Sequence, residues 1–261
     1  MAILFHEIRR NRLSLIIWSL AIAYMLAISI IIFPEMQTQM GDIGEMFSDM
    51  GAFSEAFGMD QLNFGEFMDY FGIECSNTLG LGGAIFAALV GAGALAKEEK
   101  EHTAEFLLTH PQSRVRIITE KLLSVILQLF ILNAVVIIFS AISIIAIDVE
   151  LDIGKLALIF LSHILLQIEI AAITFGISAF MKRGEVGLGL GLVFGLYFAN
   201  ILANLTEDLE FIKFITPYSF TDGAHILNEG AIEAKYLAVG MVFAAVGIAS
   251  AYVKYTKKDI A

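Results

Sequence analysis

Three polar residues inside a long apolar run are candidates for chemistry within a membrane. His163, Gln167 and Glu169 lie in residues 156–181, where most neighbours are apolar. A buried acid in such a run is costly and is by default a candidate for a proton or cation pathway. The alternative is a hydrogen bond between helices, from Glu169 to Gln128 or Asn133, with the carboxyl group protonated. The residues themselves leave both interpretations open.

A second polar group follows in the next apolar run. Asn200 and Asn204 are one helical turn apart, and Tyr197 adjoins them. One interpretation is that they contact a transported molecule near the outer exit of its path. The other is that they hydrogen-bond across a dimer interface. The same run carries small residues at four-residue spacing, including Gly187, Gly191 and Gly195. Such a stripe lets helices approach closely, within the chain or against a second copy.

The charged segment Lys97 to Lys121 separates two apolar runs and has the composition of a docking surface. Pro111 is expected to end a short helix that begins near Thr103, and Ser113 is expected to cap the next helix. The short helix combines an apolar patch with an acidic rim, as docking surfaces do. A helix lying on the inner leaflet would instead favour Lys and Arg. The residues expected to make contact are Glu98, Glu101, Thr103, Glu105, Phe106, Leu107 and Leu108.

Enzymatic chemistry in this chain is not expected. The five histidines are scattered, and no hydrolase or metal signature assembles around them. Cys75 is the single cysteine, so a disulfide or zinc framework within one chain is excluded. A GxxxxGK[ST] phosphate-binding loop is absent from the sequence. We therefore expect no catalytic, metal or cofactor site here.

The composition places these residues on membrane-spanning helices. The chain of 261 residues is 58% hydrophobic and 16% charged, with a mean hydropathy of +0.79. Continuous apolar runs of about 20 residues are typical of transmembrane helices. The predicted fold is all-α, a polytopic membrane protein with six helices. The predicted spans are residues 14–34, 78–96, 122–147, 156–181, 186–205 and 236–254.

The distribution of basic residues predicts that both termini are cytoplasmic. Of the 16 Lys and Arg residues, 13 precede the first predicted span, follow the last, or lie between the second and third or the fourth and fifth. The other side holds only Lys155, Lys213 and Lys235, among 18 acidic residues. The net charge of −11 is therefore mostly extracytoplasmic, and we interpret it as a topology and solubility signal.

These assignments divide a single domain, residues 1–261, into spans and four other segments. Residues 1–13 form an interfacial lead-in helix, residues 97–121 the cytoplasmic charged segment, and residues 206–235 an extracytoplasmic loop. Residues 35–77 are an extracytoplasmic amphipathic loop whose Met and Phe stripes predict two short helices. Those stripes either cap the bundle or rest on the outer leaflet, or they form a pliable surface for apolar ligands.

The charged segment resembles the coupling-helix region of ABC-2 type (type V) ABC transporter permeases. The resemblance rests on Glu98, Thr103, Glu105, Leu107, Leu108, Pro111, Ser113, Arg114 and Lys121, while His102 stands where many relatives have Gly. Three further stretches agree with small bacterial members. They are EAFGM at 55–59, FIKFITPY at 211–218 and KKDI at 257–260.

The resemblance implies a permease subunit of an ATP-driven exporter in the bacterial plasma membrane. It would pair with a second permease, as a homodimer or a heterodimer, and with two ABC ATPase subunits that hold ATP and Mg. The coupling helix would contact the ATPase, and Arg114 would bind either the ATPase or lipid phosphate. Because span four lies away from the path in this family, the resemblance favours the structural interpretation of Glu169.

The cargo expected from the Met and Phe content of the outer loop is a hydrophobic or amphipathic peptide, such as a toxin or an antimicrobial peptide. Nucleic acid is not an expected partner. Two other functions stay open. One is an ion-coupled secondary transporter or channel that uses Glu169 and needs no ATPase. The other is a non-transporting sensor or immunity module in the membrane.

Overall fold

The computed structural model describes residues 2–48, 56, 65–100, 113–181 and 186–257. Within these ranges the chain is helical, and six helices are long and apolar enough to cross a membrane. The candidate spans run over Ile3–Gln37, Phe67–Ala96, Arg114–Ile147, Ile153–Ser178, Gly187–Leu205 and Ala234–Thr256. The all-α fold and the six spans predicted from the sequence are confirmed.

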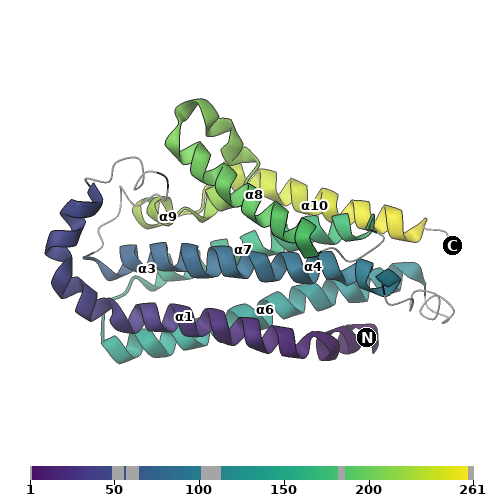
Figure 1. Ribbon diagram of the computed structural model, residues 1–261, viewed down its shortest axis with the longest axis horizontal. Coiled ribbons are helices and arrows are strands. Elements are labelled where there is room, and N and C mark those ends of the chain that lie inside the picture. Colours follow the sequence, from purple (N-terminus) through teal and green to yellow (C-terminus); the bar gives the residue numbers. More distant parts are fainter. Residues whose placement is uncertain (1, 49–55, 57–64, 101–112, 182–185, 258–261) are drawn as a thin grey trace.

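The first helix, α1 (Ala2–Ser48), is longer than a membrane is thick and contains Pro34. At 1.5 Å per residue its 47 residues correspond to roughly 70 Å. The part that follows Pro34 turns away from the axis of the preceding part (Figure 1), as expected where a proline ring removes a backbone hydrogen bond. The residues predicted as a lead-in helix form the first turns of α1, so their interfacial position stays a prediction.

The second span is assembled from three consecutive pieces without a break. These are α3 (Phe67–Cys75), the π-helical turn η1 (Ser76–Leu81) and α4 (Gly82–Lys100). The sequence predicted that this span begins at residue 78, so the helix starts earlier than expected. In the described part of the Met and Phe stripes, Phe67 and Phe71 are buried. Their rings pack on Phe33 and Phe160 at centroid distances of 5.3 and 5.6 Å. This part of the stripes therefore packs inside the bundle, as the first turns of the second span.

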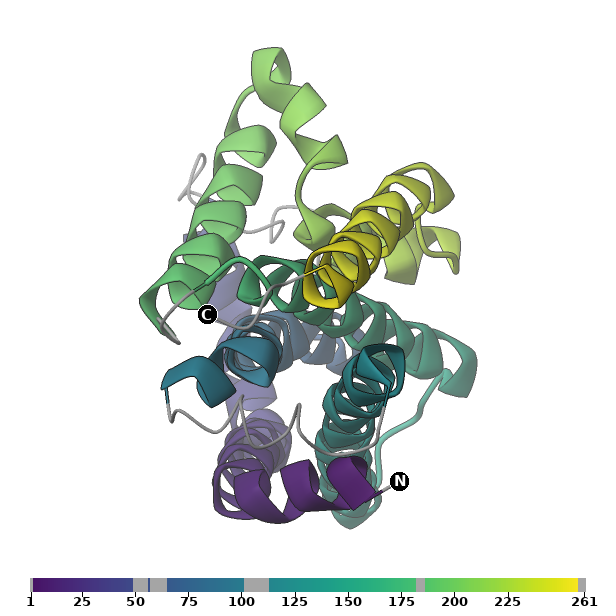
Figure 2. The same cartoon turned by 90° about the vertical axis from the view of Figure 1, so that its right-hand side faces the viewer.

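The remaining helices complete a bundle in which α4 and α7 are central. They are α6 (Arg114–Ile147), α7 (Ile153–Ser178), α8 (Val186–Leu205), the 3-10 helices η2 (Glu207–Phe214) and η3 (Pro217–Thr221), α9 (Gly223–Glu229) and α10 (Ala234–Thr256). In Figure 1, α1 lies beside α6, α4 beside α7, and α8 and α10 cover the opposite side. Figure 2 shows the same arrangement from the end that carries both termini.

Small residues bring the central helices close together. A Cβ atom on Gly176 of α7 would lie 2.5 Å from the carbonyl oxygen of Gly247 on α10. Cβ atoms on Gly83 and Gly91 of α4 would collide with the side chains of Gln167 and Thr174 on α7. The small residues of span two therefore form a packing surface within the chain, as is usual for membrane helices.

Candidate functional site

The helices on either side of the charged segment end at the face of the bundle that carries both termini (Figure 1). Helix α4 continues to Lys100, so Glu98 belongs to its last turns, and α6 begins at Arg114. The Ser113 hydroxyl oxygen accepts a hydrogen bond from the Arg116 backbone N–H at 3.3 Å, which confirms Ser113 as the helix cap. The predicted short helix lies outside the described residues, and with it Glu101, Thr103, Glu105, Phe106, Leu107, Leu108 and Pro111.

Arg114 has a partner within the chain that neither sequence alternative named. Its Nη1 donates a hydrogen bond to the carbonyl oxygen of Thr256 at 3.2 Å. Thr256 is the last residue of α10, where helix carbonyls lack intrahelical partners and a cation is favourable. Thr119 and Tyr252 add a second contact between these helices, with their hydroxyl oxygens 2.7 Å apart. The start of α6 is therefore tied to the end of α10.

At the opposite end of the bundle, a cavity of about 90 Å³ lies beside α8. Tyr197, Asn200 and Asn204 all line it. The Asn200 Oδ1 accepts a hydrogen bond from the Ser219 hydroxyl at 3.0 Å, and the Asn204 Nδ2 donates one to the Ala56 carbonyl at 3.3 Å. The polar face of α8 therefore bonds within its own chain. The other polar and charged residues that line the cavity are Ser76, Asn77, Lys213, Tyr218, Thr221, Asp222 and Glu233.

Asp222 is a partly buried carboxylate that lines this cavity. Its Oδ1 accepts hydrogen bonds from the backbone N–H groups of Ala224 and His225 at 3.0 and 3.4 Å and so caps α9. Burial raises the pKa of Asp222, and the backbone hydrogen bonds and the charge of Lys213 oppose that effect. Burial also raises the pKa of Tyr218, whose hydroxyl group has no hydrogen-bond partner in the described part of the chain.

The glycine stripe of α8 lies on a different face from its polar residues. Gly187, Gly191 and Gly195 are exposed, and a Cβ atom on any of them would meet no atom within 4 Å. Gly189 instead faces α4, where its Cβ atom would lie 3.3 Å from the carbonyl oxygen of Ala88. The stripe therefore faces away from the chain, toward lipid or a second copy.

The polar residues of α7 contact three different neighbouring elements. The Asn133 Nδ2 of α6 donates a hydrogen bond to the Gln167 Oε1 at 2.6 Å, and His163 lies against Gly80 of the π-helical turn. Glu169 is 2% exposed and lies against Gly240 of α10. Gln167 faces α6, and residues 167 and 169 point about 200° apart on a helix, so Glu169 faces away from α6. The expected hydrogen bond from Glu169 to Gln128 or Asn133 of α6 is therefore wrong. Among the described residues, the Glu169 Oε1 has no hydrogen-bond partner.

The family model described as ABC-2 family transporter protein matches residues 1–260. The chain belongs to the ABC-2 family of transporter proteins. It is a multi-pass protein of the bacterial plasma membrane. ABC-2 permeases are membrane components that generally work with ATPase partners and are not themselves catalytic. A search of curated proteins finds no match.

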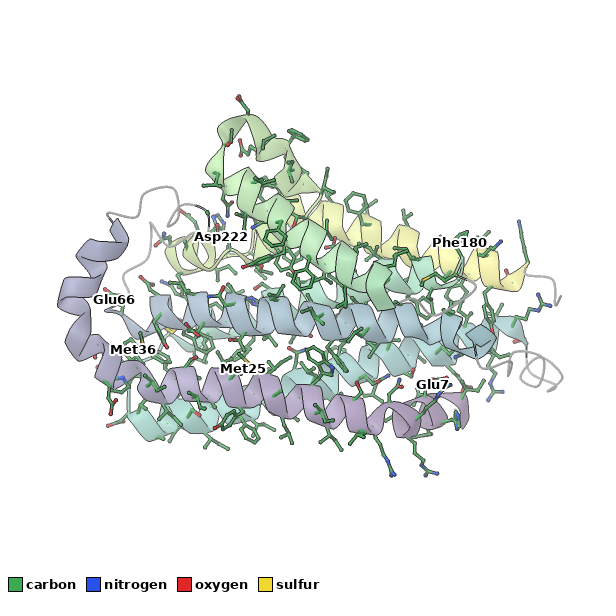
Figure 3. The ribbon with its side chains drawn as sticks, in the orientation of Figure 1. Glu7, Met25, Met36, Glu66, Phe180 and Asp222 are labelled. Atoms are coloured by element: carbon green, nitrogen blue, oxygen red, sulfur yellow. The ribbon has the colours of Figure 1, made fainter. Side chains whose placement is uncertain are left out.

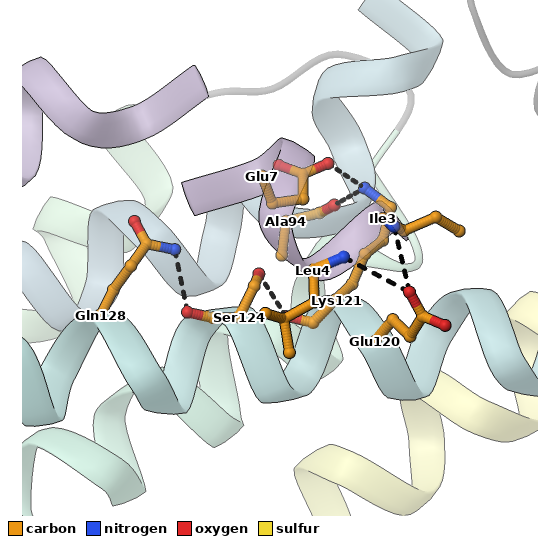
Figure 4. Close-up of polar contacts among 8 residues, drawn as sticks. All are labelled: Ile3, Leu4, Glu7, Ala94, Glu120, Lys121, Ser124 and Gln128. Carbon is orange, nitrogen blue, oxygen red and sulfur yellow. Dashed lines mark hydrogen bonds and ion pairs between the residues drawn. The ribbon is translucent and has the colours of Figure 1, made fainter. Parts of the chain in front are cut away.

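In this ABC-2 chain, a buried polar cluster next to the charged segment was not predicted from the sequence. The Lys121 Nζ lies 2.9 Å from the Glu7 Oε1 and donates a hydrogen bond to the carbonyl oxygen of Ala94 at 2.8 Å (Figure 4). The neighbouring Glu120 accepts hydrogen bonds from the backbone N–H groups of Ile3 and Leu4 at 3.0 and 3.4 Å. Charges at the start of an apolar run are ordinary in membrane proteins, so the pattern did not indicate that these side chains are buried together.

Glu74 was missed for a related reason. The sequence placed it in the outer loop, but the second span begins at Phe67 and so includes Glu74. Its Oε2 accepts a hydrogen bond from the Ser29 hydroxyl at 2.9 Å, and the Tyr70 hydroxyl donates to the Ser29 carbonyl at 3.1 Å. An earlier helix start would have been visible in the apolar spacing of Phe67, Tyr70 and Phe71 alone.

Proposed function

We propose that this chain is the membrane subunit of an ATP-driven exporter, and that two permease chains engage two separate ATPase subunits. The observation that carries this proposal is the family match over residues 1–260 on a six-helix chain. The charged segment 97–121 is the part that docks to the ATPase, and ATP and Mg are held by that partner. Its flanking helices, α4 and α6, run directly into the bundle and supply rigid connections to it.

The arrangement of α8 supports pairing with a second copy. Its exposed glycine stripe offers close backbone approach, as small-residue stripes do between membrane helices. On another face, Tyr197, Asn200 and Asn204 line the cavity at the end opposite the charged segment. We propose that cargo leaves past this region and that the cargo is a hydrophobic or amphipathic peptide. The apolar Met and Phe content of residues 35–77 favours this cargo class over sugars or nucleic acid.

Deletion of residues 103–108 tests the proposal most directly. We expect the intact chain to copurify with an ATPase that has a phosphate-binding loop and is encoded beside it, and to change the rate of ATP hydrolysis. The deletion should abolish both effects while the six-helix bundle stays folded, because these residues lie outside the spans. An intact complex that still transports after the deletion would show that the docking assignment is wrong.

A further inference from the structure

Three helices meet at one buried ammonium group at the face of the bundle that carries both termini. Lys121 of α6 contacts Glu7 of α1 and the carbonyl oxygen of Ala94 on α4. We call these three residues the Lys121 junction. The side chains of Lys121 and Glu7 are 1% and 8% exposed. Figure 3 places Glu7 toward the end that carries both termini and Asp222, which lines the cavity, in the other half of the molecule.

The junction holds its geometry because both charges are largely shielded from water. A buried ammonium group without a carboxylate is strongly destabilising, and so is the reverse. The two contacts, 2.9 Å to Glu7 and 2.8 Å to Ala94, use separate hydrogens of the same amine. If α6 moved without α1 and α4, the Lys121 ammonium group would lose the Glu7 carboxylate and the Ala94 carbonyl oxygen in a low-dielectric environment. A displacement of α6 therefore favours movement of α1 and α4 with it.

The residue next to Lys121 makes a second connection to α1. Glu120 accepts hydrogen bonds from the backbone N–H groups of Ile3 and Leu4, in the first turn of α1. Helix N-terminal amides lack intrahelical partners and favour a negative charge, so a carboxylate from another helix is a strong cap. Consecutive residues of α6 thus hold both the first turn of α1 and the turn that follows it.

The position of the junction along the chain gives these contacts a role. Ala94 lies about two turns before the end of α4, and Lys121 about two turns after the start of α6. The two helices are the arms on either side of the segment between Lys100 and Arg114. Both arms are therefore joined to α1 close to the point where that segment leaves them.

We propose that the Lys121 junction is the linkage that passes movement of the segment between α4 and α6 to α1. This inference rests on the proposed function, in which that segment docks to an ATPase. Lys121 and Glu7 are positioning residues: they contact neither ATP nor cargo, and they make α1, α4 and α6 move as one body at this end of the molecule.

The decisive variant replaces both charges, as Glu7→Leu/Lys121→Leu. Exchanging a buried ion pair for apolar residues usually preserves folding, whereas a single substitution leaves a stranded charge. The matched control is Arg116→Gln. It removes an ion pair of 3.0 Å in the same turns of α6, but that pair joins residues of one helix and the Arg116 side chain is 57% exposed. The backbone hydrogen bonds from Ile3 and Leu4 go to the other oxygen of Glu120 and do not involve Arg116. Glu7→Lys/Lys121→Glu restores the ion pair but leaves residue 121 without a donor for the Ala94 carbonyl. This exchange should recover part of the linkage that the double leucine variant loses.

The first measurement is the distance between two spin labels on the chain alone in nanodiscs, in a Cys75→Ala background. The labels are placed at Leu13 of α1 and Leu123 of α6, both of which are exposed. We expect one narrow distance distribution in the parent and in Arg116→Gln. In Glu7→Leu/Lys121→Leu the distribution should broaden. An unchanged distribution in the double variant would overturn the linkage, whatever the outcome with an ATPase.

The second measurement uses the complex with the ATPase and compares two label pairs, Leu13 with Val253 of α10 and Leu123 with Val253. In the parent, ATP should shift both distances. In the double variant the Leu123 shift should persist, the Leu13 shift should be lost, and the stimulation of ATP hydrolysis should fall roughly five- to tenfold. Retention of both shifts would overturn the linkage. Absence of ATPase binding in the parent would instead contradict the proposed function, and the nanodisc result would still decide the linkage.

Discussion

Single glycines control how closely α7 and α10 pack. Gly176 lies where an added Cβ atom would meet the backbone of Gly247, which cannot move aside as a flexible side chain can. Overpacking of this kind costs about 1–3 kcal/mol. At an open helical position, Gly to Ala instead favours the helix by roughly 1 kcal/mol. The sign of the stability change therefore distinguishes packed glycines from open ones.

We expect Gly176→Ala to lower the unfolding temperature in detergent because α7 and α10 must separate. The matched control is Gly93→Ala on α4, where an added Cβ atom meets nothing within 4 Å. It should leave stability unchanged or raise it. If the two variants had the same unfolding temperature in a thermal unfolding assay, the close packing of α7 on α10 at Gly176 would be contradicted.

Asp222 is expected to make stability depend on pH. Burial raises its pKa above the ordinary value of 3.8, so the folded chain holds this proton more tightly than the unfolded chain does. The resulting stabilisation is complete below the unfolded pKa and is lost as pH rises through the folded pKa. Asn caps a helix about as well as Asp and carries no charge at any pH.

Asp222→Asn should therefore gain stability relative to the parent as pH rises from 4 to 8. Unfolding temperatures of both proteins across this range measure the difference. If the difference in unfolding temperature between the two proteins stayed constant with pH, the pKa of Asp222 would be the same in the folded and unfolded chains. That result would contradict the prediction.

At the scale of elements, α8 combines faces with separate roles. Its polar residues line the cavity, Gly189 packs on α4, and the Gly191 stripe is open. Gly191→Leu should reduce self-association in lipid bilayers because the added side chain keeps a second helix away. The stability of the isolated chain should not change. Single-molecule photobleaching in vesicles measures the fraction of dimers.

The comparison variant is Gly189→Leu, which should destabilise the chain because the α4 backbone lies 3.3 Å from its Cβ position. Gly191→Leu with an undiminished dimer fraction would show that the stripe faces lipid only.

At the scale of the whole molecule, the structure separates two ends. Glu7 of the Lys121 junction lies toward the end that carries both termini, and Asp222, which lines the polar cavity, lies in the other half of the molecule (Figure 3). An exporter needs such a separation, because energy enters on the cytoplasmic side and cargo leaves on the outer side. Glu169 is part of neither the Lys121 junction nor the lining of the cavity, since it faces Gly240 between α7 and α10.

Glu169→Gln should accordingly preserve ATPase stimulation and complex formation. The purified chain alone, reconstituted in vesicles with an internal pH dye, should show no proton flux, and the substitution should change nothing. Proton flux that Glu169→Gln abolishes would favour the ion-coupled transporter over the exporter.

Much of the fold was predictable because each span is defined by local composition. Apolar runs of membrane length, the cap at Ser113 and the faces of α8 follow from spacing along one helix. The start of the second span was misplaced because the acidic residues Asp69 and Glu74 are typical of loops, although the apolar spacing of Phe67, Tyr70 and Phe71 favours a helix. The partner of Glu169 was wrong because the neighbour of a helix face depends on tertiary packing.

The sequence by itself determined that the chain spans a membrane six times and that residues 97–121 interrupt its apolar runs. The resemblance of that segment also pointed to the ABC-2 family, which the family match confirms. Only the tertiary structure brought Glu7, Ala94 and Lys121 together, from three separate helices. Hydrophobic length is a local property and can be read along the chain, whereas the partner of a buried charge is set by which helices pack together.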